Sequence, residues 1–329
     1  MTGRPALVAC DLDGTLLDDD GSAVPGIVQA LGELCAVGVL VVICTGRTAS
    51  ATRAAAARLG LERGPAISCH GAVVVDLADG RWLERLDLPP QAVGAVVRAT
   101  LGAGATLTAY VDDERWVQAS PAGAALAGVA GAEGASLPGT RAHADLAAAL
   151  EGRSVTRLIV EGAAACAAAT PGVAGPGVAG PAVDVAAAVG TAATAGVAEP
   201  LAAMLAGLVS RLPGLALSPA PGGRFEVHHA AADKRTALVA LCERLGVPAS
   251  AVVACGDGAV DAGMIDWAGQ GVAIAEGHEA ALAVAEGHEA ALAVADVVVA
   301  RGELAAFLLD LAGADGGASP DRSTAGGAG

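Results

Sequence analysis

The chain has 329 residues and a formal net charge of -16, with 35 acidic side chains against 19 basic ones. A surface this acidic repels nucleic acid and anionic membranes, and an aromatic content of 2% is too low for a platform on which bases stack. No apolar stretch has the length of a membrane-spanning helix without a Gly, Pro or charged residue. The first apolar run also meets Asp11 too early for a signal peptide. We therefore expect a cytoplasmic protein that binds neither nucleic acid nor membranes.

The cysteines give no sign of a metal site or a disulfide framework. There are 7 of them, an odd number, and none forms a Cys-x-x-Cys pair. Cys10, Cys44, Cys69 and Cys255 each lie at the end of an apolar run. We expect small buried thiols in a reducing compartment.

The N-terminal part alternates between short apolar runs and helical patterns. Apolar runs at 6–10, 39–44 and 66–69 predict buried strands, while 25–36 and 48–59 predict helices. The runs are continuously apolar, which is typical of strands covered on both faces. This strand–helix–strand order predicts a parallel sheet with right-handed crossovers.

The pattern changes beyond about residue 80. Residues 73–86 predict a hairpin with Asp79 and Gly80 in its turn, and residues 106–119 predict a second strand pair. A helix is expected at 142–151 and a strand at 154–162, whereas about 163–199 is an Ala/Gly/Val segment of low complexity with no predicted structure. Mixed strands and helices of this kind favour a separate α+β module.

Alternation returns near residue 224. The predicted strands are 225–229, 251–255, 270–275 and 295–300, and the predicted helices are 233–245, 260–268 and 302–312. The sheet therefore begins, stops for a different module and resumes. We predict a doubly wound parallel-sheet α/β core at 1–85 and 221–312, an inserted α+β cap domain at 86–220, and a disordered tail at 313–329.

A tandem repeat lies within the second core part. AEGHEAALAV occupies 275–284 and again 285–294. Two copies of so short a period are too few for a solenoid, so we interpret them as a local duplication that lengthens a loop or helix. His278 and His288 each precede a Glu, and a solvated helix face is favoured there over a metal site.

Polar residues gather where the predicted parallel strands end. Asp11 and Asp13 follow the first strand, residues 45–47 (Thr-Gly-Arg) follow the second, and Asp257 and Asp261 follow the strand at 251–255. The carboxyl ends of parallel strands lie along one edge of a sheet, which is where ligands bind. Lys234, the only lysine of the chain, opens a helix that we expect at the same edge.

The chemistry of such a group points to phosphoryl transfer. Carboxylates crowded together need a cation, and oxygen ligands favour Mg²⁺. A hydroxyl (Thr45), amides beside Gly46 and an ammonium (Lys234) suit a phosphoryl group. One carboxylate can attack phosphorus and a second can transfer the proton. Each feature alone is an ordinary turn or cap, so the prediction depends on their joint arrangement.

Four motifs of the chain resemble the haloacid dehalogenase (HAD) superfamily, specifically its Cof-like branch with a large mixed α/β (type IIB) cap. They are DLDGTLL at 11–17, TGR at 45–47, Asp233-Lys234, and GDGAVDAGMIDWAGQGVAIA at 256–275. The resemblance implies a Mg²⁺-dependent phosphatase that hydrolyses a small phosphorylated metabolite through an aspartyl-phosphate. Sugar phosphates, nucleotides and cofactor phosphates all fit such a site.

The resemblance also implies a role for each matching residue. Asp11 would be the nucleophile and Asp13 the general acid/base. Thr45, Gly46 and Lys234 would hold the phosphoryl group. The metal would be bound by Asp11, Asp257 and the backbone carbonyl of Asp13, with Asp261 supporting it, while Arg47 and His70 are candidate substrate contacts.

Two positions depart from the family pattern. Val260 and His70 stand where the family usually has Asn, a residue that this chain never uses. Because Val260 cannot hydrogen-bond, we expect weaker metal or substrate binding. An alternative is therefore a non-catalytic or weakly active phospho-ligand-binding regulatory protein on the same scaffold. A third reading, an ordinary α/β domain with Asp residues in its turns, does not explain why the polar residues share one sheet edge.

Overall fold

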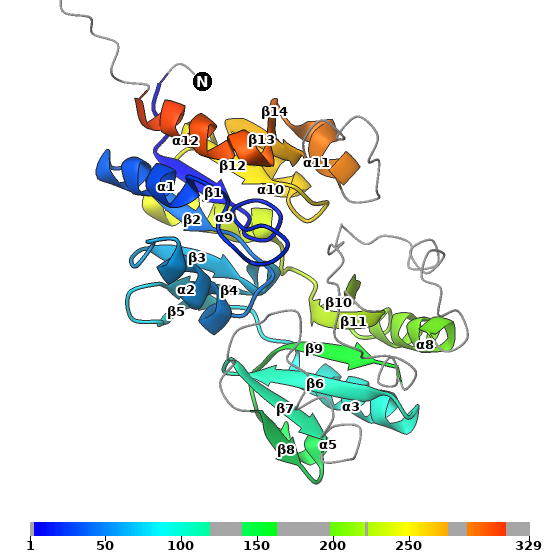
Figure 1. Ribbon diagram of the computed structural model, residues 1–329. Coiled ribbons are helices and arrows are strands. Elements are labelled where there is room, and N and C mark those ends of the chain that lie inside the picture. The colour runs from blue at the N-terminus through cyan, green and yellow to red at the C-terminus, as the bar shows by residue number, and fades with distance from the viewer. Residues whose placement is uncertain (1–2, 119–139, 163–197, 221–222, 276–287, 314–329) are drawn as a thin grey trace, which may run out of the picture.

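The computed structural model describes residues 3–118, 140–162, 198–220, 223–275 and 288–313, and their strands form a parallel sheet and two further sheets (Figure 1). The parallel sheet has the order β14-β13-β12-β1-β2. Its strands are β1 (Leu7–Cys10), β2 (Leu40–Ile43), β12 (Val252–Gly256), β13 (Gln270–Ala275) and β14 (Val297–Ala300). The prediction of a parallel α/β core is confirmed.

Helices cover both faces of this sheet. Val8 and Cys10 of β1 pack against the face with α1 (Ile27–Ala36), α2 (Ala49–Arg58) and α12 (Leu304–Gly313). The alternating residues Leu7 and Ala9 pack against the other face, with α9 (Lys234–Leu245) and α10 (Ala262–Trp267). All four side chains are fully buried, which is why the run is continuously apolar. Helix α11 (His288–Val294) packs on α10 and β13.

The strand expected at 66–69 does not lie in the parallel sheet. It is β3 (Pro65–Ser68), which pairs antiparallel with β4 (Val73–Asp76), and β4 pairs with β5 (Trp82–Arg85). Only an isolated bridge between Cys44 and Ile67 joins β3 to the end of β2. The chain reverses after β3 through a tight turn, η1 (Cys69–Gly71). The left-handed φ angles of Cys69 (50°), His70 (53°) and Gly71 (101°) make that reversal.

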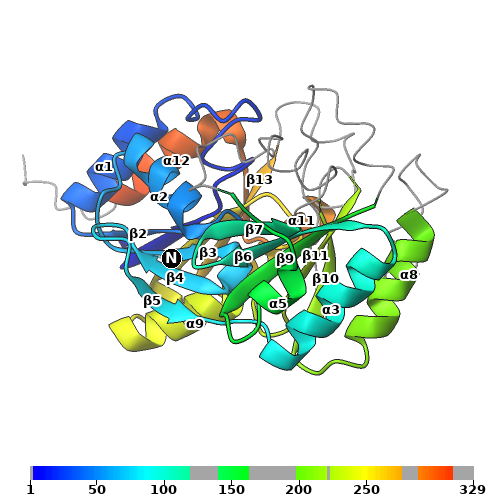
Figure 2. The same cartoon turned by 90° about the horizontal axis from the view of Figure 1, so that it is seen from below.

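A six-stranded sheet of order β10-β11-β9-β6-β7-β8 forms the second part of the molecule. With the helices α3, α5 and α8, which lie on one face of it in Figure 2, we call it the cap. Its strands are β6 (Thr106–Val111), β7 (Glu114–Gln118), β8 (Arg141–His143), β9 (Val155–Glu161), β10 (Leu215–Ala220) and β11 (Arg224–His229). Its helices are α3 (Pro90–Gly102), α5 (Leu146–Ala149) and α8 (Ala198–Val209).

Strand β11 was expected to return the chain to the parallel sheet, and it instead pairs antiparallel with β9 and β10. Phe225 and Val227 alternate inward and are buried in the apolar core of the cap, which fixes the strand there. The strand pairs expected at 73–86 and 106–119 are present. Helix α3 was not predicted, and the helix expected at 142–151 is reduced to the single turn of α5.

Several expectations fall outside the described residues. These are the low-complexity segment up to residue 197, the first copy of the tandem repeat beyond residue 275, His278, and the tail from residue 314. Part of the second copy is α11. Among the helices that the structure does describe, none combines the length and apolarity that a membrane span requires.

Buried thiols account for most of the described cysteines. Cys10, Cys44, Cys69, Cys242 and Cys255 are buried and none is in a disulfide. Burial raises the pKa of Cys44 well above its ordinary value, and it raises the pKa of Cys242 to about 11. Cys44 and Cys242 therefore remain protonated near pH 7, and the burial of the five thiols is as expected from the sequence.

Candidate active site

Three strand ends of the parallel sheet bring the predicted residues together. Strand β1 lies between β2 and β12, with Cys10 in register with Ile43 and Cys255. Asp11 follows β1 directly, and its amide donates to the carbonyl of Cys255 at 2.9 Å. Residues that follow β1, β2 and β12 must therefore meet at this edge.

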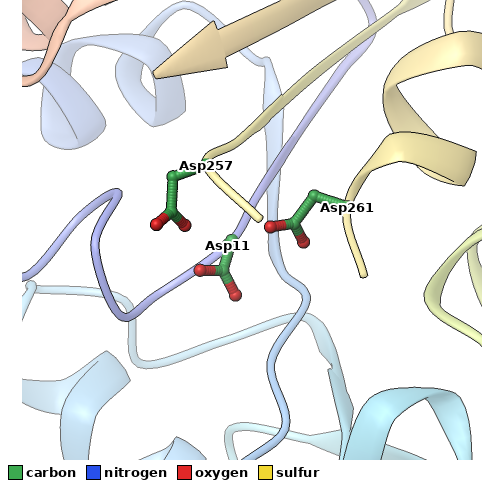
Figure 3. A group of neighbouring side chains, drawn as sticks. All are labelled: Asp11, Asp257 and Asp261. Atoms are coloured by element: carbon green, nitrogen blue, oxygen red, sulfur yellow. The ribbon is translucent and has the colours of Figure 1, made fainter. Parts of the chain in front are cut away.

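Three carboxylates gather there from two segments. One carboxylate oxygen from each of Asp11, Asp257 and Asp261 lies within 4.8 Å of the others, and Figure 3 shows the three side chains gathered together. Asp11 is 6% exposed and Asp261 only 1%. The carboxylate of Asp257 lies against Gly14, which has a φ of 86°. Any side chain at residue 14 would overlap this carboxylate. The hydroxyl of Thr15 donates to Asp257 at 3.4 Å.

Lys234 lies among these carboxylates. Asp233 caps helix α9 by accepting from the amide of Thr236 at 2.9 Å, which makes Lys234 the first residue of the helix. The Lys234 side chain is 2% exposed, and its Nζ donates to Asp11 Oδ1 at 2.5 Å and to Asp261 Oδ1 at 2.7 Å. One buried ammonium thus joins two of the three carboxylates.

Asp261 is bonded through both of its oxygens. While Oδ1 accepts from Lys234, Oδ2 accepts from the amide of Gly258 at 3.0 Å. Asp261 can lie this close to the end of β12 because residue 256 is a glycine, and a side chain at residue 256 would overlap Asp261. Asp261 therefore anchors Lys234, and it also belongs with Asp11 and Asp257 to the group of carboxylates that could hold a metal ion.

The site carries a surplus of negative charge. Burial raises the pKa of Asp11 well above its ordinary value; Lys234 opposes that shift, and Asp261 and Asp257 add to it. Burial alone would lower the pKa of Lys234, but Asp11 and Asp261 outweigh it and hold that pKa above its ordinary value. Three carboxylates face one ammonium, so a divalent cation would balance the group. Oxygen-only ligands of this kind fit Mg²⁺.

Asp13 is not one of the three clustered carboxylates, and its side chain is bonded to Arg47 instead. Arg47 holds it in a two-pronged ion pair, with Nε donating to Oδ2 at 2.9 Å and Nη2 donating to Oδ1 at 2.5 Å. The Asp13 side chain is 55% exposed, whereas that of Arg47 is 12% exposed. Arg47, which was predicted to contact the substrate, is therefore bonded to Asp13, which was predicted to be the acid/base.

Thr45, Gly46 and His70 form the neighbouring side of the site. Thr45 is buried at 1% exposure, and its Oγ1 accepts from the amide of Arg47 at 3.2 Å. The ring of His70 lies against Gly46, where a side chain would overlap it. Burial lowers the pKa of His70 to about 4, with Glu226 opposing at 3.9 Å from Nε2. His70 is therefore neutral near pH 7.

Sequence reasoning missed the cap residues that reach this edge. Arg157 of β9 donates from Nη1 to the carbonyl of Gly46 at 3.0 Å, stacks on Tyr110 at 4.4 Å, and lies 3.6 Å from Glu226. Asp113, from the turn between β6 and β7, contacts the start of α2. The only signals in the sequence were an Arg within an apolar strand and an Asp-Asp pair in a hairpin turn.

Comparison with known proteins finds a family match over most of the chain. The family model described as haloacid dehalogenase-like hydrolase matches residues 8–133 and 198–291. No curated protein matches the chain at a significant level.

Solved structures share the fold over nearly the whole chain. A haloacid dehalogenase-like hydrolase from Bacteroides thetaiotaomicron superposes with a TM-score of 0.70 at 19% identity, covering 94% of this chain and 100% of the other. A protein from Thermotoga maritima gives 0.68 at 19% identity, covering 94% and 96%. A sugar phosphatase of HAD subclass IIB gives 0.61 at 15% identity, covering 93% and 97%. With the family model matching well over half of its residues, the chain belongs to the haloacid dehalogenase-like hydrolases.

Proposed function

We propose that the protein is a Mg²⁺-dependent phosphatase acting on a small phosphomonoester through an aspartyl-phosphate on Asp11. The observation that carries this proposal is the buried bridge from Lys234 to Asp11 and Asp261, beside Asp257. A protein that only binds phosphate would be expected to avoid surplus negative charge, since that charge repels the ligand. Here a carboxylate suited to be a nucleophile, that of Asp11, is held 2.5 Å from the Lys234 ammonium within such a site. The solved sugar phosphatase with the same fold supports the same chemistry.

In the first step Oδ2 of Asp11, the oxygen that does not accept from Lys234, attacks phosphorus. The bond from phosphorus to the leaving oxygen breaks, and Asp13 gives that oxygen its proton. Lys234 and the hydroxyl of Thr45 bind the oxygens of the phosphoryl group. A bound Mg²⁺ would be held by Asp11 and Asp257, and it supplies positive charge that screens the carboxylates from the anionic substrate.

In the second step water attacks the phosphorus of the aspartyl-phosphate. Asp13 takes a proton from that water, the bond to Asp11 breaks, and inorganic phosphate leaves. Asp13 must exchange its contact with Arg47 for the substrate in order to do this. Arg47 then keeps the carboxylate close to the site between the two steps.

Phosphate release from p-nitrophenyl phosphate tests the proposal. We expect release by the wild type with Mg²⁺, none with EDTA, and a loss of at least about a thousandfold for Asp11→Asn. Asp310→Asn, an exposed acid on α12, is the matched control and should keep full activity. A folded wild-type protein that releases no phosphate at any pH or Mg²⁺ concentration would instead favour a phospho-ligand binder.

A further inference from the structure

Residues 45–50, which we call the phosphate loop, draw their hydrogen bonds from both parts of the molecule. The carbonyls of Thr45 and Arg47 accept from the amides of His70 (3.1 Å) and Cys69 (2.8 Å), both in the core. The carbonyl of Gly46 between them accepts from the guanidinium of Arg157, which belongs to the cap. The carbonyl of Gly46 in the phosphate loop is thus hydrogen-bonded by a side chain of the cap.

The start of helix α2 is also bonded from the cap. Asp113 accepts from the amide of Ala49 through Oδ1 at 3.2 Å and from the amide of Ser50 through Oδ2 at 2.6 Å. The local cap, Thr48, accepts from Ala51 only at 3.4 Å. A carboxylate at this end of a helix is also favoured by the helix dipole. Two amides of the first turn of α2 therefore have their acceptor in a distant part of the chain, on Asp113.

The turn that carries Asp113 is built at a conformational cost. Asp112 and Asp113 are the two residues between β6 and β7, with left-handed φ angles of 48° and 72°. Such a turn favours Asn, Asp or Gly at its first position and Gly at its second, so Asp113 is the strained residue. Both carboxylates are nevertheless used, because Asp112 accepts from Arg85 Nη1 at 2.6 Å while Asp113 bonds α2. A turn that only reversed the chain would not need either side chain.

We propose that Asp113 and Arg157 are positioning residues through which the cap completes the phosphate site. When the cap contacts the core, they fix the Gly46 carbonyl and the amides of Ala49 and Ser50, and with them the position of Thr45. When the cap leaves, these three backbone groups bond water and the loop loses its fixed conformation. Phosphate affinity is then coupled to cap contact. The proposal rests on the phosphatase function proposed above.

The test uses the full chain with Asp113→Gly, because glycine suits the left-handed turn and removes only the carboxylate. We expect hydrogen exchange at Ala49 and Ser50 to accelerate at least about tenfold. We also expect the dissociation constant of inorganic phosphate, measured by calorimetry with Mg²⁺, to rise about tenfold, as for one lost hydrogen bond to a charged group. KM for p-nitrophenyl phosphate should rise with it, more than kcat falls. Arg157→Lys should weaken phosphate binding in the same direction.

Asp145→Ala is the matched control. Asp145 also caps a helix of the cap, accepting from Ala148 at 3.0 Å, but the helix is α5, within the cap itself. Unchanged exchange and phosphate affinity in Asp113→Gly would overturn the proposal, and so would an equal weakening by Asp145→Ala. If the wild type binds inorganic phosphate without releasing any from esters, the phosphatase function fails and calorimetry still decides the role of Asp113. If it does neither, both proposals fail.

Discussion

The core edge and the cap contribute to one site by different means. In the core, Asp11, Thr45 and Asp257 each follow a strand, so the parallel register alone brings them together. In the cap, Asp113 and Arg157 come from a hairpin turn and the middle of a strand, and they reach the site only because the cap contacts the start of α2 and the carbonyl of Gly46. The proposed catalytic groups thus lie in short local motifs, while the groups proposed to position them come from long-range contacts.

The largest effect is expected where the core motifs converge, at Lys234. Lys234→Met removes the ammonium that joins Asp11 and Asp261, so we expect kcat for p-nitrophenyl phosphate to fall at least about a hundredfold. Asp11 and Asp261 are then buried without a positive counter-charge, which should lower the free energy of unfolding by about 3–5 kcal/mol without added Mg²⁺. Steady-state kinetics and urea unfolding measure the two effects.

Two further variants separate the ammonium from charge in general. Lys234→Arg should not restore activity, since the planar guanidinium cannot replace a point charge between two carboxylates. Arg235→Met, the exposed neighbour, should behave as the wild type. Full activity in Lys234→Arg would show that the site needs only a positive charge at this position and not the geometry of an ammonium. The core motifs would then not require the exact positioning that distinguishes them from the cap contacts.

The same difference between local motifs and long-range contacts explains which features could be predicted from the sequence. Continuous apolar runs predicted the parallel strands because burial on both faces leaves that pattern, and the Asp residues at their ends followed from the topology. β3 and β11 were misplaced because a short apolar run does not specify its partner strand. The pairing of Asp13 with Arg47 and the contact of Asp113 with α2 could not be predicted, since each depends on the packing of distant segments.

A smaller effect is expected at His70, a core residue packed between Gly46 and Glu226 of the cap. Burial lowers its pKa from 6.5 to about 4, so between these values the unfolded chain binds a proton that the folded chain does not. Stability should therefore fall as pH drops from 6.5 toward 4. The ring is 31% exposed, so we expect a loss of about 1 kcal/mol between pH 7 and 5 rather than the full value.

His70→Asn should remove this dependence. Asparagine does not titrate, and it tolerates the left-handed φ of 53° better than histidine does. Urea unfolding of both proteins from pH 7 to 5 stays above the range in which the lowered pKa of Glu226 matters, since its ordinary value is 4.5. Parallel stability curves would mean that burial does not keep His70 neutral in the folded protein, and that its contact with Glu226 of the cap outweighs burial.

The smallest effect is expected at Val260, in the loop between Asp257 and Asp261. Its Cγ2 lies 3.6 Å from the point where Gly258 would carry a side chain, so it lines the same loop that bonds Asp261. An asparagine there adds a donor and an acceptor without disturbing the Gly258 amide. With one hydrogen bond worth about 1 kcal/mol, Val260→Asn should lower the Mg²⁺ concentration for half-maximal activity about threefold to fivefold. Ala259→Ser controls for added polarity at the neighbouring position. An unchanged Mg²⁺ requirement would mean that the core edge already binds its metal through Asp11 and Asp257 alone. The residue at position 260 would then be dispensable, although it lies within a local motif.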